Sequence, residues 1–403
     1  MYNERKQSHI LMAWELGGGF GHISRMTALA KGFLARGHRV SLCLSDLSRS
    51  YDFVGHLPVG LYQTPVWLPR LQTNREPACF SDILLRRGYG SVKGLLALTR
   101  AWQGLFNRLS ADLLVLDYAP TALLATRDWP QPKIVISSGF GVSVPGAPDG
   151  CLRPWLPKGQ EWTQAREKQV VDVVNRLLKQ WAVTPIRYVA DLFQADHFFL
   201  FTLPELDSPK NWRSAQATFL RPPSEPGCME PAVWPDRAGK RVFAYLKTSS
   251  RHCPAAMQSI ANLPCTGVIV CGGLAKQQAM RFARPGLNIY CEPRDVTMVQ
   301  KTADVVVCHA GKNTISETLL AGKPLLLIPE QLEQYLNALQ VEKQQAGICV
   351  RRDSDQNKIQ QDLERLMTEP EFSDASRRIA EKNVGLNQLD PVATIVDHCE
   401  GLL

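Results

Sequence analysis

Short apolar runs alternate with helix-like segments along the chain, and this alternation constrains the fold more than any other feature. Buried strands that alternate with helices are typical of a parallel α/β sheet. The helix-like segments are clearest at residues 23–37, 119–129 and 167–183. The strand-like runs occupy residues 9–16, 38–47, 112–117, 133–139, 195–206, 241–250, 266–273, 287–293, 304–311 and 324–330. We therefore expect an α/β protein built on parallel sheets.

The alternation is interrupted once, by a proline-rich stretch. At 403 residues the chain is too long for one ordinary core, which favours two domains. Prolines are frequent in residues 223–239, which we interpret as a linker. The expected domains are residues 1–222 and 240–384, with a C-terminal helix in residues 385–403 that packs back on the first domain. Two such domains would leave a ligand-binding cleft between the carboxyl ends of their sheets.

The composition is that of a globular protein. Apolar residues make up 45% of the chain, charged residues 21%, and no apolar run reaches the roughly 18–20 residues of a spanning helix. No secretory signal follows Met1, so we expect a cytoplasmic protein. The 11 cysteines show no zinc-like spacing, and no metal site is predicted. The net charge of +8 suits an anionic partner, but no nucleic-acid-binding module is recognisable.

A glycine-rich turn follows the first strand-like run and raises the question of a dinucleotide site. It reads GGGFGH at residues 17–22 and opens a helix-like segment. In a G-x-G-x-x-G fingerprint that begins at Gly17, the third glycine position falls on His22. The turn therefore does not predict a nicotinamide cofactor. A histidine at a helix N-terminus is disfavoured in its charged form by the helix dipole, so its neutral form is available as a base.

The strongest signal lies in the second half, where a buried strand, a tight turn and a helix follow one another. The free backbone N–H groups of residues 311–314 would form, together with the helix dipole, an anion site suited to a diphosphate. His309 or Lys312 can add charge-assisted contacts. An alternative is that Thr314 and Glu317 form a capping box that only satisfies the helix end.

The whole string resembles the nucleotide-sugar-binding signature of GT-B glycosyltransferases, specifically of the UDP-glycosyltransferase-like superfamily. The matching positions are His309, Gly311, Thr314, Glu317, Gly322, Pro324, Pro329, Glu333, Gln334, Asn337, Ala338 and Gly347. The commonest form has two glycines after the histidine, whereas this loop contains Ala310, Lys312 and Asn313. The resemblance implies a GT-B fold, in which two Rossmann-like domains face a central cleft.

The resemblance also implies how a nucleoside diphosphate sugar would be bound. Its diphosphate would contact His309 and the loop after it, formed by Gly311, Lys312, Asn313 and Thr314. Glu317 would accept hydrogen bonds from the ribose hydroxyls, and Glu333 and Gln334 would bind hydroxyls of the donor sugar. A uridine diphosphate sugar is the expected donor, with thymidine diphosphate next. The donor is a co-substrate, and no bound cofactor is expected.

The same superfamily has a catalytic histidine in the turn of the first half. Its GH…LA…L…GH pattern matches His22 and the later Gly37–His38, which makes His22 the implied base. Asp117 ends a strand-like run and matches the aspartate that orients the base. Two alternatives are that Asp117 only caps the following helix and that His22 only contacts substrate.

The other polar and glycine positions of the turn are assigned to the acceptor. Glu15 ends the first strand-like run and is a candidate for acceptor binding. Gly18, Gly19 and Gly21 would let donor sugar and acceptor approach the backbone closely.

These residues predict an inverting, metal-independent glycosyltransferase of the hexosyltransferase type. His22, steered by Asp117, would deprotonate an acceptor hydroxyl while the helix after His309 stabilises the leaving diphosphate. The rivals are a GT-B sugar-nucleotide epimerase and a non-catalytic GT-B auxiliary protein. The acceptor is not specified. Residues 90–109 form a helix with apolar and basic faces, which would either pack on the sheet or lie peripherally on the inner face of the membrane.

Overall fold

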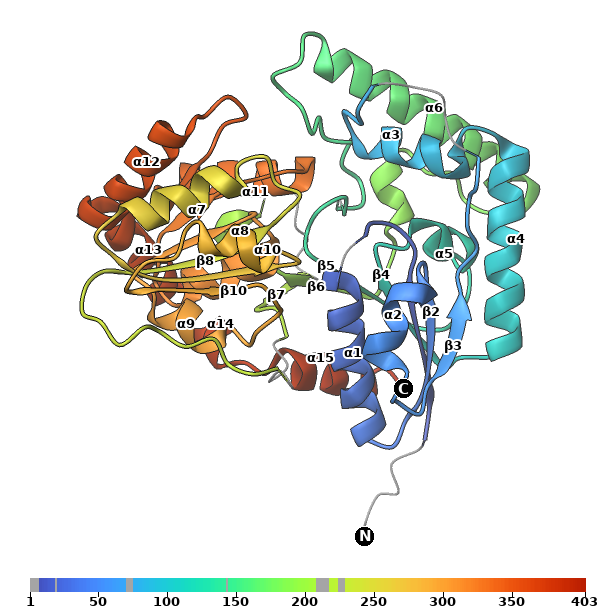
Figure 1. Cartoon of the computed structure of the whole chain (residues 1–403). Helices are drawn as coiled ribbons and strands as arrows, with labels where there is room; N and C mark the ends of the chain where they lie inside the picture. The colour runs from blue at the N-terminus through green and yellow to red at the C-terminus, as the bar shows by residue number, and fades with distance from the viewer. Residues whose placement is uncertain (1–6, 19, 70–74, 143, 208–216, 224–228) are drawn as a thin grey trace. The chain divides into compact units, whose positions relative to one another are not determined.

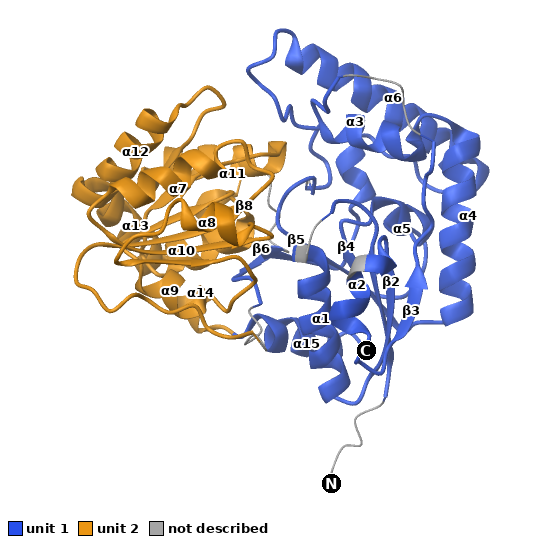
Figure 2. Cartoon of the chain, in the orientation of Figure 1, with its two compact units in different colours: residues 1–201, 209–223, 390–403 blue, residues 202–208, 224–389 orange. Residues whose placement is uncertain are grey.

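The computed structural model shows two compact units. It describes residues 7–18, 20–69, 75–142, 144–207, 217–223 and 229–403. Unit 1 comprises residues 1–201, 209–223 and 390–403, and unit 2 comprises residues 202–208 and 224–389 (Figure 2).

The unit boundaries differ from the expected domain boundaries at three places. Residues 202–208, expected in the first domain, lie with unit 2. Of the described residues of the predicted linker, Pro223 lies with unit 1 and residues 229–239 lie with unit 2. There Ala232 is buried, its N–H donates to the Asp295 carbonyl at 2.8 Å, and Pro231 pairs with Asp295. Residues 385–389 also lie with unit 2, so that only the last helix returns to unit 1. The pairing of Pro231 with Asp295 and the burial of Ala232 therefore hold residues 229–239 on unit 2.

Unit 1 is built on a seven-stranded parallel sheet with the order β3-β2-β1-β4-β5-β6-β7 (Figure 1). Its strands are β1 (His9–Trp14), β2 (Arg39–Leu44), β3 (Gly60–Gln63), β4 (Leu113–Asp117), β5 (Lys133–Ser137), β6 (His197–Phe201) and β7 (Ala217–Leu220). The predicted runs of the first half correspond to the five central strands. The edge strands β3 and β7 are four residues long and lie outside the predicted runs.

Helices cover both faces of this sheet, because successive residues of a strand point to opposite sides. Ile10 and Met12 of β1 pack with α1 and α15, whereas Leu11 and Ala13 pack in the cluster formed by α3 to α6. The helices are α1 (Phe20–Ala35), α2 (Leu47–Val54), α3 (Phe80–Leu84), α4 (Val92–Leu109), α5 (Pro120–Ala125), α6 (Gly159–Gln180) and α15 (Pro391–Glu400). A π-helical turn η1 (Leu85–Tyr89) and a 3₁₀ turn η2 (Val189–Leu192) complete the unit.

Helix α4 corresponds to the segment with apolar and basic faces. Its apolar residues, among them Leu95, Trp102 and Phe106, are buried in the core of unit 1. The prediction that this helix packs on the sheet therefore holds, because the core of unit 1 covers its apolar face, which is not available to a membrane surface. None of the helices in the described ranges is both long enough and apolar enough to cross a membrane.

Unit 2 repeats the doubly wound arrangement with six parallel strands in the order β10-β9-β8-β11-β12-β13. The strands are β8 (Arg241–Lys247), β9 (Thr266–Gly272), β10 (Leu287–Tyr290), β11 (Val305–Cys308), β12 (Leu325–Leu327) and β13 (Gly347–Cys349). The helices are α7 (Cys253–Asn262), α8 (Lys276–Met280), α9 (Thr297–Thr302), α10 (Lys312–Leu320), α11 (Leu332–Lys343), α12 (Gln356–Thr368), α13 (Pro370–Lys382) and α14 (Val384–Gln388), with a 3₁₀ turn η3 (Pro204–Leu206). Two doubly wound parallel sheets confirm the predicted fold class.

Candidate functional site

Neighbouring strands of unit 1 bring a histidine and an aspartate into contact. β1 pairs with β4, and Trp14 lies opposite Asp117 at the carboxyl ends of both strands. The turn after β1 leads into α1, whose first turn carries His22. The His22 Nδ1 atom lies 3.0 Å from Asp117 Oδ2. The Asp117 side chain is 1% exposed and that of His22 is 16% exposed, so the imidazole alone reaches the surface.

Asp117 is not a helix cap. The helix that follows it, α5, has Ala119 at its N-cap and no side-chain hydrogen bond there. Both carboxylate oxygens instead accept from Arg25 Nη2, at 3.1 and 2.9 Å. Burial alone would raise the pKa of Asp117, but the charges of Arg25 and His22 outweigh it and hold that pKa below its ordinary value. The carboxyl group is therefore ionised at neutral pH.

The sequence interpretation missed Arg25. The residue is 3% exposed, and its guanidinium lies 5.5 Å from the centre of the Phe201 ring. The sequence contained one signal for a role of Arg25 beside the base. His22 and Arg25 are three residues apart in a predicted helix, and residues with this spacing share a helix face. An arginine that shares a face with a proposed base is a candidate partner for the same carboxylate.

Two aromatic rings fix the plane of the imidazole. The Trp14 ring stacks on His22 with centroids 5.1 Å apart and an angle of 11°, and the Tyr118 ring is 6.5 Å away at 6°. The Trp14 Nε1–H donates to the Leu16 carbonyl at 2.6 Å, which anchors the indole. Tyr118 has a φ of 48°, an uncommon conformation for a residue with a side chain. The backbone strain at Tyr118 accompanies the placement of its ring beside His22.

Gly17 is the glycine that this turn requires. It has a φ of 85°, and a Cβ atom there would lie 2.7 Å from His22 Nε2. A Cβ at Gly18 or Gly21 would meet nothing within 4 Å, so these predicted residues border open space. Gly19 lies outside the described residues. Gly17, which the sequence interpretation did not select, keeps the Nε2 atom uncovered.

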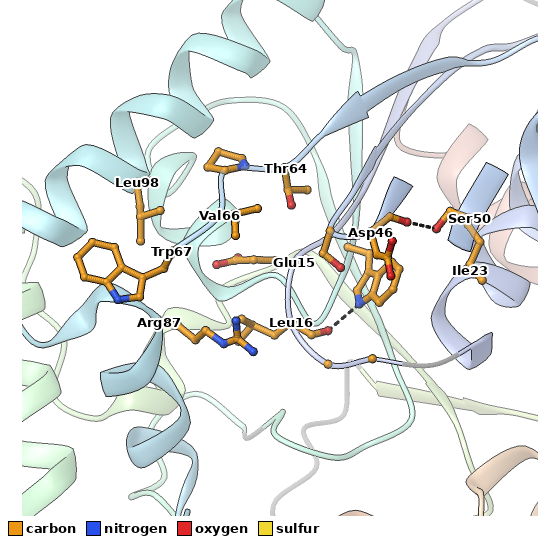
Figure 3. A pocket seen from close by; sticks show the side chains of 15 residues that line it. Glu15, Leu16, Ile23, Asp46, Ser50, Thr64, Val66, Trp67, Arg87 and Leu98 are labelled. Atoms are coloured by element: carbon orange, nitrogen blue, oxygen red, sulfur yellow. Dashed lines mark hydrogen bonds between the residues drawn. The ribbon is translucent and has the colours of Figure 1, made fainter. Parts of the chain in front are cut away.

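A cavity of about 210 Å³ opens in unit 1 beside this turn. Its lining includes Gly17 and Gly18 together with apolar and charged side chains. Those labelled in Figure 3 include Glu15, Asp46, Val66, Trp67, Arg87 and Leu98. The cavity therefore brings an apolar wall and several polar groups close to the proposed base.

Glu15 lines this cavity and also holds the start of α5. Its Oε2 atom accepts the backbone N–H of Thr121 at 2.8 Å and that of Ala122 at 3.4 Å. Burial raises the pKa of Glu15 to about 7, although these hydrogen bonds and the charge of Arg87 act in the opposite direction. The residue predicted to bind the acceptor thus has a structural contact in addition to its place in the cavity wall.

In unit 2, His309 follows β11 at the carboxyl edge of the sheet. Its Nδ1 atom lies 3.1 Å from the carbonyl oxygen of Ile328. Because a carbonyl oxygen only accepts, Nδ1 carries a proton, and Nε2 of the neutral ring carries a lone pair. This Nε2 atom is buried and has no hydrogen-bond partner within the described ranges. Burial is the main cause that lowers the pKa of His309; Lys247 acts in the same direction, against Ile328 and Glu330.

Helix α10 begins with an open N-terminus beside His309. Its N-cap is Gly311, and no side chain makes a capping hydrogen bond. The capping-box alternative is therefore wrong, because Thr314 is the third residue of the helix and does not precede it. Lys312 and Asn313 form the first turn, and the Lys312 Nζ atom lies 3.5 Å from the Leu206 carbonyl. Such an uncapped first turn presents N–H groups and the positive end of the helix dipole.

Two further signature residues support the loop from α11. The Asn337 side-chain amide donates to the Ala310 carbonyl at 3.1 Å, which ties α11 to the turn before α10. Gln334 caps α11, since its Oε1 accepts the N–H of Glu330 at 2.9 Å and that of Gln331 at 3.2 Å. Its amide nitrogen is not used in these contacts. Glu333 lies in the first turn of the same helix, half-buried.

Known proteins with similar sequences are glycosyltransferases. The profile of the glycosyltransferase family 28 C-terminal domain matches residues 264–389. A zeaxanthin glucosyltransferase of Pseudescherichia vulneris is 24% identical over 379 residues, which cover 86% of this chain and 88% of that protein. A UDP-N-acetylglucosamine--N-acetylmuramyl-(pentapeptide) pyrophosphoryl-undecaprenol N-acetylglucosamine transferase of Francisella philomiragia is 38% identical over 63 residues, which are 15% of this chain and only 17% of that protein.

Solved structures share the fold over nearly the whole chain. The calicheamicin glycosyltransferase CalG4 has a TM-score of 0.74 at 19% identity, covering 99% of this chain and 98% of that one. The glycosyltransferase SsfS6 of Streptomyces sp. SF2575, complexed with thymidine diphosphate, has a TM-score of 0.66 at 18% identity, covering 98% of this chain and 100% of that one. The protein is thus a glycosyltransferase with the GT-B fold. Its similarity to these glycosyltransferases agrees with the resemblance to the UDP-glycosyltransferase-like superfamily noted in the sequence.

Proposed function

We propose that the protein transfers a sugar from a nucleoside diphosphate sugar, in first place a uridine diphosphate sugar, to a hydroxyl group of an apolar acceptor. The reaction inverts the anomeric centre, and His22 is the base. The observation that carries this proposal is the 3.0 Å contact between His22 Nδ1 and the buried Asp117 carboxylate. A carboxylate at Nδ1 leaves Nε2 as the basic atom, which is the arrangement needed to remove a hydroxyl proton.

Donor binding is assigned to unit 2. The uncapped first turn of α10 suits the negative charge of a diphosphate, and the charge of Lys312 adds to it. Negative charge develops on the leaving diphosphate in the transition state, so the same groups stabilise it more strongly as the bond breaks. The positive charge comes from the chain itself, and the proposed route uses no metal ion. Glu317, on the same helix, is assigned to the ribose hydroxyls.

Acceptor binding is assigned to the cavity of unit 1. Its Trp67 indole packs where Cβ atoms at Gly88 and Gly94 would lie only 3.1 and 2.9 Å from the ring, so two glycines make room for this aromatic wall. Val66 is 48% exposed and Leu68 is 81% exposed, which extends the apolar surface outward. A volume of about 210 Å³ is below the roughly 300–1,000 Å³ of a pocket that encloses a drug-sized ligand. We therefore expect an apolar acceptor that enters the cavity only in part.

The cavity also offers polar contacts for orienting that acceptor. The Thr64 Oγ1 atom lies in its wall, is buried, and has no hydrogen-bond partner among the described residues. In the view of Figure 3 the Glu15 side chain lies between Trp67 and Asp46. A buried hydroxyl without a partner costs about 1–3 kcal/mol, which a bound acceptor group would relieve. These groups are suited to a second hydroxyl of the acceptor.

The direct test is product analysis. The protein is incubated with uridine and thymidine diphosphate sugars and with apolar alcohols and phenols, and released nucleotide and the anomeric configuration of the product are measured. Transfer with inversion supports the proposal. Retention of configuration contradicts the single-displacement route, and epimerised donor formed without an acceptor contradicts the transferase assignment.

Two variants separate the halves of the proposal. His22→Ala should abolish transfer and leave nucleotide affinity intact, whereas the exposed His56→Ala in the same unit should change neither. Glu317→Ala should weaken nucleotide binding, with the exposed Glu381→Ala as its control. Transfer by His22→Ala at a rate comparable to that of the parent enzyme contradicts the base assignment. Unchanged affinity in Glu317→Ala contradicts the assignment of this residue to the ribose.

A further inference from the structure

A buried arginine is attached to the histidine–aspartate pair of unit 1. Arg25 Nη2 lies 2.9 Å from Asp117 Oδ2 and 3.1 Å from His22 Nδ1. The side chains of Arg25 and Asp117 are 4% and 1% exposed, so their charges are almost completely removed from water. The Arg25 Nε atom is buried and has no hydrogen-bond partner within the described ranges, whereas Nη2 contacts Asp117 and His22.

The distances fix which atom carries the imidazole proton. A guanidinium group only donates hydrogen bonds, and an ionised carboxylate only accepts them. The His22 Nδ1 atom therefore either donates to Asp117 or accepts from Arg25. The carboxylate is the partner that carries an opposite charge, and a charge-assisted N–H···O⁻ bond is stronger than a bond to the ring nitrogen. Nδ1 is thus protonated in the resting state, and Nε2, beside Gly17, carries the lone pair.

Arg25 also determines how many protons the buried cluster holds. The charges of Arg25 and Asp117 cancel, so the cluster is neutral when His22 has no extra proton. Without the guanidinium, the cluster would be neutral when a protonated His22 faces the ionised Asp117. A buried cluster with a net charge is costly, and each cluster therefore favours its neutral composition. An imidazole that is already protonated cannot act as a base.

We propose that Arg25 is a positioning residue that keeps Asp117 ionised and His22 unprotonated between turnovers. The proposal rests on the function proposed above, in which His22 is the base. The charged or titratable groups in contact with the imidazole are Asp117 from β4, Arg25 from its own helix, and the Tyr118 phenol that follows β4. The pKa of Asp117, lowered despite burial chiefly by Arg25, is consistent with this charge count.

The test is the pH dependence of kcat in Arg25→Met and Arg25→Lys. Removal of a cation next to an ionising group shifts its titration by roughly one to three pH units. In Arg25→Met the acidic limb of the profile should move to higher pH by this amount, because the protonated ring is no longer repelled. At neutral pH kcat should fall, by up to about tenfold for each pH unit of the shift, and it should recover at alkaline pH. Arg25→Lys keeps the charge and should keep the limb near that of the parent enzyme.

Arg36→Met is the matched control, since Arg36 directly follows the same helix but pairs with Asp397 and Glu400 of α15. In Arg36→Met the acidic and the basic limb of the pH profile of kcat should lie at the same pH as in the parent enzyme. A uniform loss of kcat in Arg25→Met, with the limbs unmoved, would show a merely structural role and overturn the proposal. If His22→Ala is inactive and Arg25→Met behaves like the parent enzyme, only the role of Arg25 fails. If His22→Ala is active, the proposed base fails first.

Discussion

The two units use a histidine at a similar place but give it different neighbours. His22 lies in the first turn of the helix after β1, and His309 lies between β11 and α10. Both use Nδ1 for a hydrogen bond within their own unit. His22 binds the Asp117 carboxylate at 3.0 Å, whereas His309 binds the Ile328 carbonyl at 3.1 Å. A carboxylate stabilises the imidazolium that forms during catalysis, and a carbonyl does so much less. In the proposed function, the partner of Nδ1 thus distinguishes the base, His22, from the donor-binding histidine, His309.

The largest effect is expected when the carboxylate of unit 1 is made neutral. In Asp117→Asn the side-chain amide can donate to His22 Nδ1, which places the ring proton on Nε2 and removes the basic atom. We expect kcat to fall by about 10²–10⁴-fold, the usual contribution of a general base, while nucleotide affinity stays constant. Steady-state kinetics and a nucleotide titration of the same preparation measure both quantities.

This substitution also leaves Arg25 buried without its anion. The free energy of unfolding should therefore fall by roughly 3–5 kcal/mol, and the assay must be run well below the melting temperature. Asp112→Asn is a control for loss of a carboxylate in unit 1, because Asp112 precedes β4, at the end away from Asp117, and accepts the backbone N–H of His9 at 2.7 Å. A kcat within about threefold of the parent enzyme in Asp117→Asn would remove the distinction between the two histidines.

A second difference between the units lies in the turn before the helix. Gly17 has a φ of 85° and borders His22 Nε2, so Gly17→Ala both strains the backbone and displaces the ring. We expect a loss of about 1–2 kcal/mol in the free energy of unfolding and a loss of kcat on the order of tenfold to a hundredfold. Gly18→Ala should leave stability within about 0.5 kcal/mol, because its Cβ meets open space. If Gly17→Ala and Gly18→Ala have the same free energy of unfolding, glycine is not specifically required at position 17.

The sequence was sufficient to predict both sheets, and it selected His22 and Asp117, which the structure brings into contact. Parallel strands are buried on both faces, so runs such as residues 9–16 and 304–311 are apolar throughout and easily recognised. Strands β3, β7 and β13 were not predicted, because their sequences GLYQ, ATFL and GIC contain no long apolar run. The proline-rich stretch was recognised, but its attachment to unit 2 depends on pairing with Asp295, which no local pattern encodes.

Within the site, the missing information was three-dimensional. Arg25 could not be told from a solvated arginine, because its burial depends on the packing of α1 against Phe201 and Asp117. The four glycines of the first turn look equivalent in the sequence, and only the backbone angle and the place of the imidazole distinguish Gly17. Which ring nitrogen of His309 carries the proton likewise depends on the contact of Nδ1 with the Ile328 carbonyl oxygen, which is 19 residues away in the chain.

That protonated nitrogen predicts a pH dependence of donor binding. With Nδ1 bonded to Ile328, Nε2 of His309 can donate to a phosphate oxygen only after it takes up a proton. Burial lowers the pKa of His309 in the free protein, and bound phosphate opposes this shift, so binding is coupled to proton uptake. The dissociation constant of a uridine diphosphate sugar, whose own charge is constant, should rise about tenfold between about pH 6 and about pH 8. Calorimetry in buffers of different ionisation enthalpy measures the proton uptake directly.

His309→Gln provides the control, because an amide donates a hydrogen bond without titrating. Its donor affinity should be nearly independent of pH over the same range. A parent enzyme whose donor affinity does not depend on pH would show that Nε2 does not donate to the diphosphate. The contrast between the two histidines would then rest on His22 alone.

The smallest effect is expected at Ala310, the counterpart of Gly17 in unit 2. Ala310 has a φ of 57° and is fully buried, so its backbone is strained while its methyl group packs in the core. Ala310→Gly relieves about 1–2 kcal/mol of strain, but it loses about 0.8 kcal/mol of apolar burial and gains flexibility in the unfolded chain. These contributions nearly cancel, and denaturant unfolding should show a change within about 1 kcal/mol. If the free energy of unfolding rises by more than about 2 kcal/mol, strain dominates and the turn of unit 2 favours glycine, as the turn of unit 1 does at Gly17. If it falls by as much, packing of the methyl group dominates and the turn of unit 2 favours alanine.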